Sequence, residues 1–422
     1  MNFQLVSDTN ESIMSRLDYV IFGATGFTGE FVAKDIASNH PNATFAIAGR
    51  TQAKLDKVNA QLSRKASKTI IANVTDQESL VKMAASAKVL INCVGPFRFY
   101  GLPIVEAAVE AGTNYCDISG EPWFIEKAEY EFNDQAKEKS IYIVSACGFD
   151  SIPSDMGVEF TRNEFSKKFP TDKLNSIEAY MRVNSGSAGY TGHATTLECA
   201  VHGFSSIGDL IKLRKQAKSK NPEIIPPVGQ KLRPKKSFHP QPGNPSRASL
   251  PFPGSDRSIV KRSQQKIAQN TEFNAIDFFI YFTIANTLMG KFKSAVFGGM
   301  FNTFVKFSFG RKMIIKYPGL FTGGGFSHAG PNEEQRKQTN FQFEFYGKGV
   351  NSDNKIQTKL FCKHDPGYEA TAAMLTSCAS VILNEGDKMP GNGGVMTTAY
   401  AFKDTTIFEK LEQRDLEFTV VG

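Results

Sequence analysis

The sequence lacks the patterns that mark several common classes of protein. Its six cysteines lie far apart and include no C-x-x-C pair, which favours buried thiols in a reducing compartment over a disulfide framework or a zinc site. The N-terminal stretch up to Arg16 is polar and includes acidic side chains, so neither a secretory signal nor a transit peptide is evident. No uncharged run reaches the roughly 18 apolar residues of a membrane-spanning helix.

Signatures of metal binding and of nucleophilic catalysis are also missing. The six histidines form no ligand-spaced pair, so we expect no metal site, and the chain has no P-loop and no Ser-His-Asp order. His193 alone has a suggestive setting, in a Gly/Thr turn that leads into a helix. We expect a solvated loop histidine there. The net charge of +7 is mild and no nucleic-acid-binding motif accompanies it, so no nucleic-acid partner is expected.

A glycine motif near the N-terminus is the feature around which the chain is organised. Four apolar residues, Tyr19 to Phe22, run into three glycines spaced three apart, and an apolar helical pattern follows. A strand that turns into a helix through such glycines lets backbone amides close on a phosphate at the helix N-terminus. The residues expected to hold the pyrophosphate of a dinucleotide are Gly23, Thr25, Gly26, Phe27, Thr28 and Gly29.

The end of the second predicted strand indicates which dinucleotide binds. In NAD-binding units an acidic side chain near this position accepts hydrogen bonds from the ribose 2′-OH. Here the strand at residues 44–49 is followed by Arg50, with Thr51 and Lys54 just beyond. Because a cation suits a 2′-phosphate, we predict NADP(H), with NAD(H) as the less favoured cofactor. The alternative is that Arg50 merely ends a strand.

Strand-like and helix-like segments alternate as far as Val144, which predicts a parallel, doubly wound sheet of the Rossmann type. Gly95 and Pro96 follow the fourth strand, at the sheet edge where such folds bind ligands, and are added to the cofactor site. Polar residues near the same edge are weak candidates for a proton donor: Tyr100, Asp117, Glu121 and Asp150. Residues in such places more often cap helices or close turns, so the catalytic residue stays unassigned.

The second half of the chain predicts a different architecture. Residues 195–214 have a helical pattern, and residues 219–258 hold nine prolines and seven Lys or Arg, which predicts an extended, basic surface linker without helix or central strand. Strand, helix and strand patterns follow beyond residue 340, typical of an α+β domain. We therefore expect a Rossmann domain at residues 1–153 and an α+β substrate and dimerisation domain at residues 154–422, with a homodimer left open.

Residues 276–310 form an aromatic, basic segment. From Phe278 to Asn332 there is no Asp or Glu, whereas six Lys or Arg are present. We expect a helical segment whose two apolar halves are each too short to cross a bilayer. Such halves would lie in a lipid interface, with aromatic side chains inserted and cations toward anionic headgroups. The alternative is a buried helical pair inside the domain or at a dimer interface.

Five motifs in order bring a family into view. They are Gly23-Ala24-Thr25-Gly26-Phe27-Thr28-Gly29, Ala48-Gly49-Arg50, Asn92-Cys93-Val94-Gly95-Pro96-Phe97-Arg98-Phe99-Tyr100-Gly101, Asp117-Ile118-Ser119-Gly120-Glu121 and Gly148-Phe149-Asp150-Ser151-Ile152-Pro153-Ser154-Asp155. From about Tyr19 to the C-terminus the chain resembles the saccharopine dehydrogenase family, in its saccharopine dehydrogenase-like oxidoreductase branch. The resemblance implies a Rossmann domain followed by an α+β domain, a nicotinamide cofactor and association with lipid droplets. This branch of the family is also similar to bacterial trans-acting enoyl reductases. The resemblance further implies that the His193 segment faces the cofactor. It identifies no catalytic residue.

These observations predict an NADP(H)-dependent oxidoreductase that acts at a lipid droplet or a cytoplasmic membrane surface. Its substrate would be apolar and acyl or glycolipid-related, because we find no clear cluster of cations for a small charged amino acid such as saccharopine. Reduction of a C=C or C=N bond is favoured. Two alternatives stay open: a binding or scaffold protein of lipid droplets with a vestigial nucleotide site, and a soluble mitochondrial amino-acid dehydrogenase.

Overall fold

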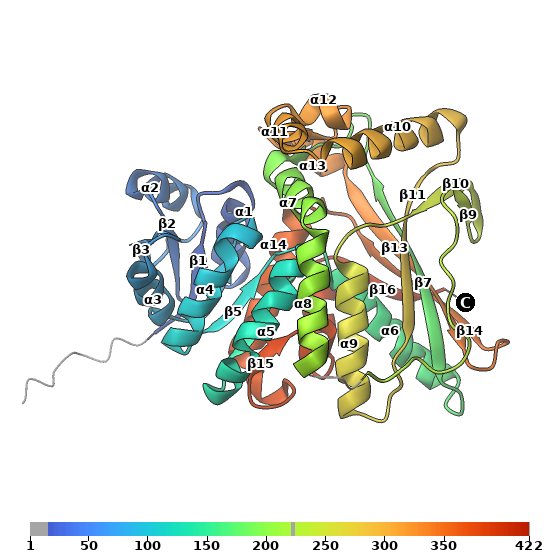
Figure 1. The fold of residues 1–422 in the computed structure, drawn as a ribbon. Helices are drawn as coiled ribbons and strands as arrows, with labels where there is room; N and C mark the ends of the chain where they lie inside the picture. The colour runs from blue at the N-terminus through green and yellow to red at the C-terminus, as the bar shows by residue number, and fades with distance from the viewer. Residues whose placement is uncertain (1–15, 221–223, 422) are drawn as a thin grey trace, which may run out of the picture.

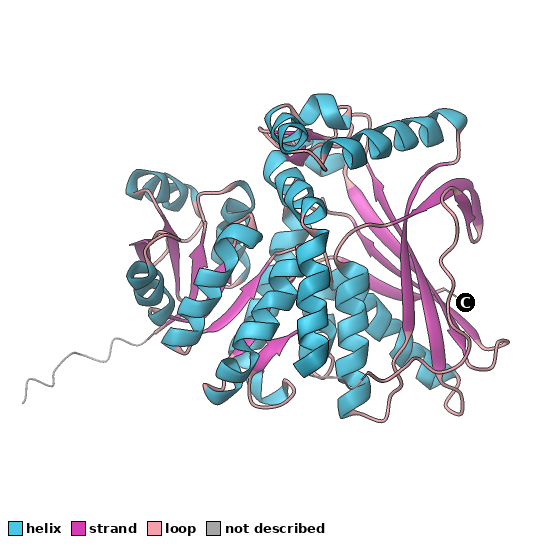
Figure 2. Ribbon diagram, viewed as in Figure 1, coloured by secondary structure: helices cyan, strands magenta, loops and turns pink. Residues whose placement is uncertain are grey.

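Two seven-stranded sheets, each covered by helices, form the framework of the computed structural model, which describes residues 16–220 and 224–421 (Figures 1 and 2). The first sheet lies on the left in Figure 1 and the second on the right. Residues 1–15, for which no targeting signal was expected, and linker positions 221–223 lie outside the described residues.

All strands of the first sheet are parallel, which confirms the predicted Rossmann-type sheet. Its order is β3 (Lys68–Ile71), β2 (Phe45–Gly49), β1 (Leu17–Phe22), β4 (Ala87–Asn92), β5 (Asn114–Asp117), β6 (Tyr142–Val144) and β15 (Gly394–Met396). In β1 the residues from Tyr19 to Phe22 are all buried, because helices cover both faces and a continuous apolar strand is required.

Helices connect successive strands of this sheet and cover it. They are α1 (Phe27–Asn39), α2 (Gln52–Gln61), α3 (Gln77–Ala85), α4 (Phe97–Ala111) and α5 (Pro122–Glu138). The next helix, α6 (Ile152–Lys168), follows β6 but leads to the second sheet and packs on it. The C-terminal region contributes as well, since α14 (Glu369–Asn384) packs on α1, β4 and β5, and β15 pairs with β6. The division expected at residues 153/154 assigns both elements to the second domain, although β15 is a strand of the first sheet and α14 packs against it.

The second sheet is mixed, as expected for an α+β domain. Its order is β16 (Leu416–Val420), β14 (Lys355–Cys362), β13 (Asn340–Gly349), β7 (Leu174–Asn184), β11 (Asp277–Ala285), β10 (Asn244–Pro251) and β9 (His239–Gln241). Only β7 and β11 pair in parallel. The accompanying helices are α9 (Asp256–Asn270), α13 (Glu333–Gln338), α15 (Thr398–Phe402) and α16 (Ile407–Glu412).

Three sequence predictions in this domain were wrong in part. Residues 277–285, expected to be the first helical half of segment 276–310, form strand β11, which is paired on both sides. The run is almost entirely aromatic or β-branched, which suits an interior strand. The proline-rich linker likewise contains β10, whose interior residues 246–250 are free of proline and pair with β9 and β11. The single helix expected at residues 195–214 is two helices, α7 (Ala194–Ser205) and α8 (Ile207–Lys220).

Four helices and a two-stranded sheet form a separate layer, at the top in Figure 1, which we call the cap. The cap comprises residues 192–205, with β8 (Gly192–His193) and α7, and residues 288–327, with α10 (Leu288–Phe304), α11 (Ser308–Lys316), α12 (Pro318–Thr322) and β12 (Phe326–Ser327). It has a small core of its own, centred on Leu197, Val201, Ile314 and Phe321. No helix among the described residues is long and apolar enough to span a bilayer.

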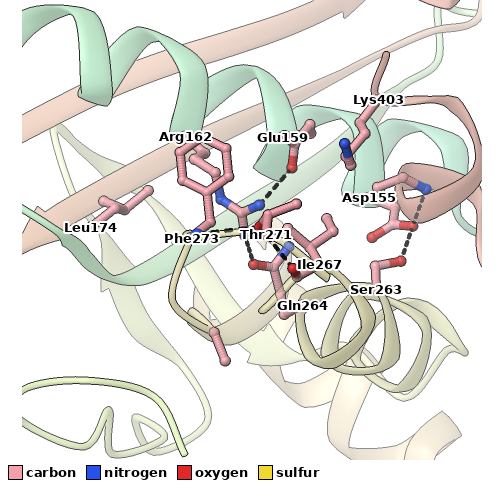
Figure 3. Close-up of polar contacts among 12 residues, drawn as sticks. Asp155, Glu159, Arg162, Leu174, Ser263, Gln264, Ile267, Thr271, Phe273 and Lys403 are labelled. Carbon is pink, nitrogen blue, oxygen red and sulfur yellow. Dashed lines mark hydrogen bonds and ion pairs between the residues drawn. The ribbon is translucent and has the colours of Figure 1, made fainter. Parts of the chain in front are cut away.

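A buried polar seam joins α6 to α9 (Figure 3). The guanidinium of Arg162, 2% exposed, donates to Glu159 Oε2 at 3.1 Å and to the side-chain oxygen of Gln264. One turn earlier, Asp155 Oδ2 accepts hydrogen bonds from Ser263 and Thr398. The seam ties the helix that leaves the first sheet to the second domain.

We expect Glu159→Gln to lower the free energy of unfolding by about 3–5 kcal/mol, because it leaves the Arg162 charge buried without its partner. Glu164→Gln is a matched control on the same helix. Its partner Lys167 also lies three residues further on, but that lysine side chain is 72% exposed, so the expected cost is about 0–1 kcal/mol. Denaturant unfolding of both variants checks this, and equal costs would contradict it.

Candidate cofactor cleft

A cleft of about 1640 Å³ opens at the C-terminal ends of the parallel strands, with the glycine motif on one wall and α7 on another. The strands run in the order β3-β2-β1-β4-β5-β6, so the direction of winding reverses between β1 and β4. Ligands of open α/β sheets bind outside the strand ends at such a reversal. The cleft is therefore where the fold is expected to hold a dinucleotide.

The glycine motif has the geometry of a phosphate-binding turn. Gly23 has φ +85°, a conformation that residues with a side chain rarely adopt, and a Cβ on Gly29 would lie 2.1 Å from the Gly23 carbonyl oxygen. Gly26 precedes α1 and offers no side-chain cap. Within the described residues, the amides of Phe27 and Thr28 donate to no protein acceptor and are free for a phosphate.

Arg50 stands where a 2′-phosphate would need a cation. It follows β2, lines the cleft, is exposed, and forms no hydrogen bond or ion pair with any described residue. Thr51 is the residue before α2, and Lys54 is exposed in the first turn of that helix, but neither lines the cleft. Of the three predicted residues, Arg50 is therefore the one that lines the cleft.

We expect Arg50→Ala to weaken NADPH binding by about 10- to 150-fold, because a hydrogen bond to a charged group contributes about 1.5–3 kcal/mol. NADH binding should be unchanged, since NADH has no 2′-phosphate. Lys54→Ala serves as the matched control, because this cation is next to the cleft without lining it, and its effect should be small. Titration of each variant with both cofactors checks the prediction, and an equal loss for NADH would contradict it.

The loop after β4 forms another part of the cleft wall. Gly95 and Pro96 both line the cleft, as predicted for residues at this strand end. The loop leads directly into α4, and a carboxylate caps the start of that helix. Glu121 accepts from the backbone amides of Phe97 at 2.8 Å and Arg98 at 3.1 Å, and burial raises its pKa. Glu121 thus lines the cleft, but its oxygens are engaged in holding the α4 N-terminus.

Asp117 does not reach the cleft. Its carboxylate is fully buried and accepts hydrogen bonds from the side chains of Tyr115 and Ser145 and from the amides of Ser119 and Ala146. Burial raises the Asp117 pKa to about 6, against the effect of these four donors. The geometry is that of a carboxylate that fixes the loops after β5 and β6.

Among the candidate proton donors, Asp150 differs from Asp117 and Glu121 because its carboxylate has no hydrogen-bond partner among the described residues. It is half-buried in the cleft wall, and a Cβ on Gly120 would lie only 2.6 Å from its Oδ2. Its side chain forms no hydrogen bond or ion pair with a described residue, and burial raises its pKa to about 6. Tyr100 also lines the cleft, from an exposed position on α4.

His193 is not the solvated loop residue that we expected. It lines the cleft, and its ring stacks on Phe27 with centroids 5.1 Å apart. Its Nδ1 accepts a hydrogen bond from the Thr195 amide and thereby caps α7. Its own backbone amide donates to the Tyr368 hydroxyl at 2.6 Å, and burial lowers the pKa of the imidazole.

Cys199 and Trp123 also line the cleft, although no local sequence pattern predicts this. The described residues contain no cluster of three or more His, Cys, Asp or Glu suited to a metal ion.

Comparisons with known proteins agree with this geometry. Residues 19–144 match the saccharopine dehydrogenase NADP binding domain, so the chain is an NADP(H)-binding oxidoreductase. The chain belongs to the saccharopine dehydrogenase-like oxidoreductase family. It is 35% identical over 429 residues to the Rattus norvegicus protein of that name, covering 96% of this chain and 97% of the relative.

Other relatives differ in the location that their names state. A Caenorhabditis elegans protein named "Lipid droplet localized protein" is 35% identical over 419 residues, covering 94% of this chain and 96% of that protein. An Arabidopsis thaliana protein, named as a probable mitochondrial saccharopine dehydrogenase-like oxidoreductase, is 30% identical over 452 residues, covering 96% of both chains. Among solved structures, yeast saccharopine dehydrogenase (L-Glu forming) superposes with a TM-score of 0.59 at 13% identity, covering 96% of this chain and all of that one, which shows a shared fold.

Proposed function

We propose that this protein is an NADP(H)-dependent reductase that works at the surface of a lipid droplet or at a cytoplasmic membrane face, on an apolar, acyl or glycolipid-related substrate. The observation that carries the proposal is α10. This 17-residue helix is rich in apolar side chains, yet none of its residues is buried. Leu288 and Phe292 are 87% and 63% exposed, and Phe309 and Leu320 on α11 and α12 extend the same kind of surface. Exposed apolar patches mark sites where another apolar surface docks.

The charges of the cap indicate what that surface is. Residues 278–332 contain six cations and no carboxylate, and none of the six cations forms an ion pair with a described residue. They are Lys291, Lys293, Lys306, Arg311, Lys312 and Lys316. Anionic phospholipid headgroups complement such a surface, at about 1 kcal/mol for each cation close to it. A second copy of the chain would instead oppose six cations to six cations, so a lipid surface is favoured over a homodimer here.

Part of the cleft offers an apolar surface to a substrate. Aromatic side chains line it beyond the glycine motif, including Phe97, Trp123 and Phe252. Arg98, a cation in the same wall, is neutralised by Asp209, donates to Ser206 and lies 4.5 Å from the centre of the Trp123 ring. Arg98 is therefore not available for a substrate carboxylate, although other cations, among them Arg257 and Lys261, also line the cleft.

Asp150 is the residue that we assign to proton transfer. NADPH, held by the glycine turn and Arg50, would be the source of the hydride for one atom of a C=C or C=N bond. A protonated Asp150 carboxyl then gives its proton to the other atom and becomes a carboxylate, which completes the reduction. A pKa near 6 keeps part of this group protonated near neutral pH, as a general acid requires.

The proposal is tested by following NADPH oxidation with a panel of acceptors. Long-chain enoyl, ketone and imine compounds dispersed in artificial droplets should support turnover, whereas saccharopine in solution should not. Turnover with saccharopine and none with the long-chain compounds would overturn the proposal in favour of an amino-acid dehydrogenase, consistent with the mitochondrial alternative. No turnover with any acceptor, together with intact NADPH binding and droplet flotation, would favour a droplet-bound protein with a vestigial nucleotide site.

A further inference from the structure

The cap carries the proposed lipid-docking surface on one side and contacts the glycine motif (residues 23–29) on the other. Its outer side carries the exposed apolar helices α10 to α12, at the edge of the molecule in Figure 1. Its inner side is α7, which packs on α11 and β12. Leu197 and Val201 on α7 point into the cap core, whereas Thr196, Cys199 and Ala200 on the same helix line the cleft. A single helix therefore separates the docking surface from the site.

The N-terminus of this helix rests on the cofactor loop. His193 caps α7 and stacks on Phe27, the first residue of α1, whose amide is free for a phosphate. Tyr368 holds both residues, because its hydroxyl accepts from the His193 amide at 2.6 Å and its ring meets Phe27 edge-on at 4.6 Å. A displacement of α7 along or across its axis must therefore disturb Phe27, whose backbone amide is free for a phosphate.

We propose that lipid docking and cofactor binding are coupled through α7 and the His193–Phe27 stack. This inference rests on the proposed function, since it requires the cap to be the lipid-docking surface. Both ligands stabilise the conformation in which the cap is packed on the glycine motif. Lipid binding holds the outer helices in place, and binding of the cofactor phosphates holds the start of α1 in place. Each ligand then strengthens the binding of the other by the same factor, typically about 5- to 150-fold.

Two residue changes separate the stack from the helix cap. His193→Asn keeps a side-chain acceptor for the Thr195 amide but removes the ring that stacks on Phe27. His193→Phe keeps an aromatic ring in that place but has no acceptor. The coupling should therefore be lost in His193→Asn and retained in His193→Phe, whatever either change does to the stability of α7.

The experiment measures NADPH dissociation constants with the full chain, by quenching of Trp123, the chain's one tryptophan, which lines the cleft. Each protein is titrated without vesicles and with saturating phosphatidylcholine–phosphatidylserine vesicles. We expect vesicles to lower the wild-type dissociation constant at least 5-fold, to lower that of His193→Phe similarly, and to leave that of His193→Asn unchanged.

The outcomes separate this inference from the proposed function. If the wild-type chain floats with vesicles and binds NADPH, but its dissociation constant is the same with and without vesicles, the coupling is overturned and lipid docking stands. If the response persists in His193→Asn, the route through the stack is overturned. If the chain does not float with these vesicles at all, the proposed lipid docking fails and the coupling fails with it.

Discussion

Replacing Asp150 with asparagine is expected to lower NADPH-dependent turnover by about 10²–10⁴-fold, the usual contribution of a positioned general acid. Asparagine has nearly the same shape, so the packing against Gly120 is kept, but it carries no ionisable proton. The NADPH dissociation constant should change little, because Asp150 is not one of the residues expected to hold the cofactor phosphates. Steady-state kinetics and a cofactor titration of the variant check both parts.

The pH dependence of the same reaction provides an independent readout. Catalysis requires the protonated carboxyl, and the pKa of Asp150 is about 6. Turnover should therefore decline as pH rises through about 6, approaching a tenfold loss for each further pH unit, and Asp150→Asn should lack this limb. Asp134→Asn removes another carboxylate that lines the cleft, from an exposed position on α5, and should leave both the rate and the profile unchanged. Wild-type turnover in Asp150→Asn would refute the assignment.

Changing Leu288 and Phe292 together to aspartate is expected to weaken partitioning onto anionic vesicles and artificial droplets by about 100-fold or more. The two side chains lie four residues apart on one face of α10, and burying two such groups contributes roughly 3–6 kcal/mol. The new charges also oppose the cationic surface of the cap. Because both side chains are exposed, the free energy of unfolding should not change. Flotation and denaturant unfolding measure the two quantities.

A matched control places the same charges elsewhere. Ile71 on β3 and Val420 on β16 are exposed apolar residues outside the cap, 48% and 43% exposed. Changing this pair to aspartate should leave flotation at the wild-type level. If the α10 variant floats as well as this control, α10 is not the docking surface.

The first domain could be predicted because its signals are local. The apolar run from Tyr19 to Phe22 is buried on both faces, and the glycines follow it directly. One short segment therefore predicts the strand, the turn and the phosphate site together. Arg50 follows the next strand, and its position alone predicts a role at the cofactor. The sequence did not predict β15 as a strand of this sheet. Its three residues pair with β6, about 250 residues earlier in the chain, and such a distant pairing leaves no local pattern.

The errors have a common physical cause. Residues 277–285 are apolar on both sides, so their periodicity cannot distinguish an interior strand from a buried or interfacial helix. Only pairing with β7 and β10 decides the matter. His193 was misplaced for a similar reason, since the partners that enclose it, Phe27 and Tyr368, are more than 160 residues away in either direction. Contacts of this kind are set by tertiary packing and leave no local pattern.

The central claim is that this oxidoreductase reduces its substrate at a lipid surface, and one comparison tests it most directly. NADPH oxidation would be measured with one long-chain enoyl substrate embedded in anionic droplets and with a short-chain, water-soluble analogue, for the wild-type chain and for the Leu288→Asp/Phe292→Asp variant. The account predicts that the variant loses turnover of the embedded substrate while its turnover of the soluble analogue matches wild type. Equal turnover of the embedded substrate by both proteins would contradict it.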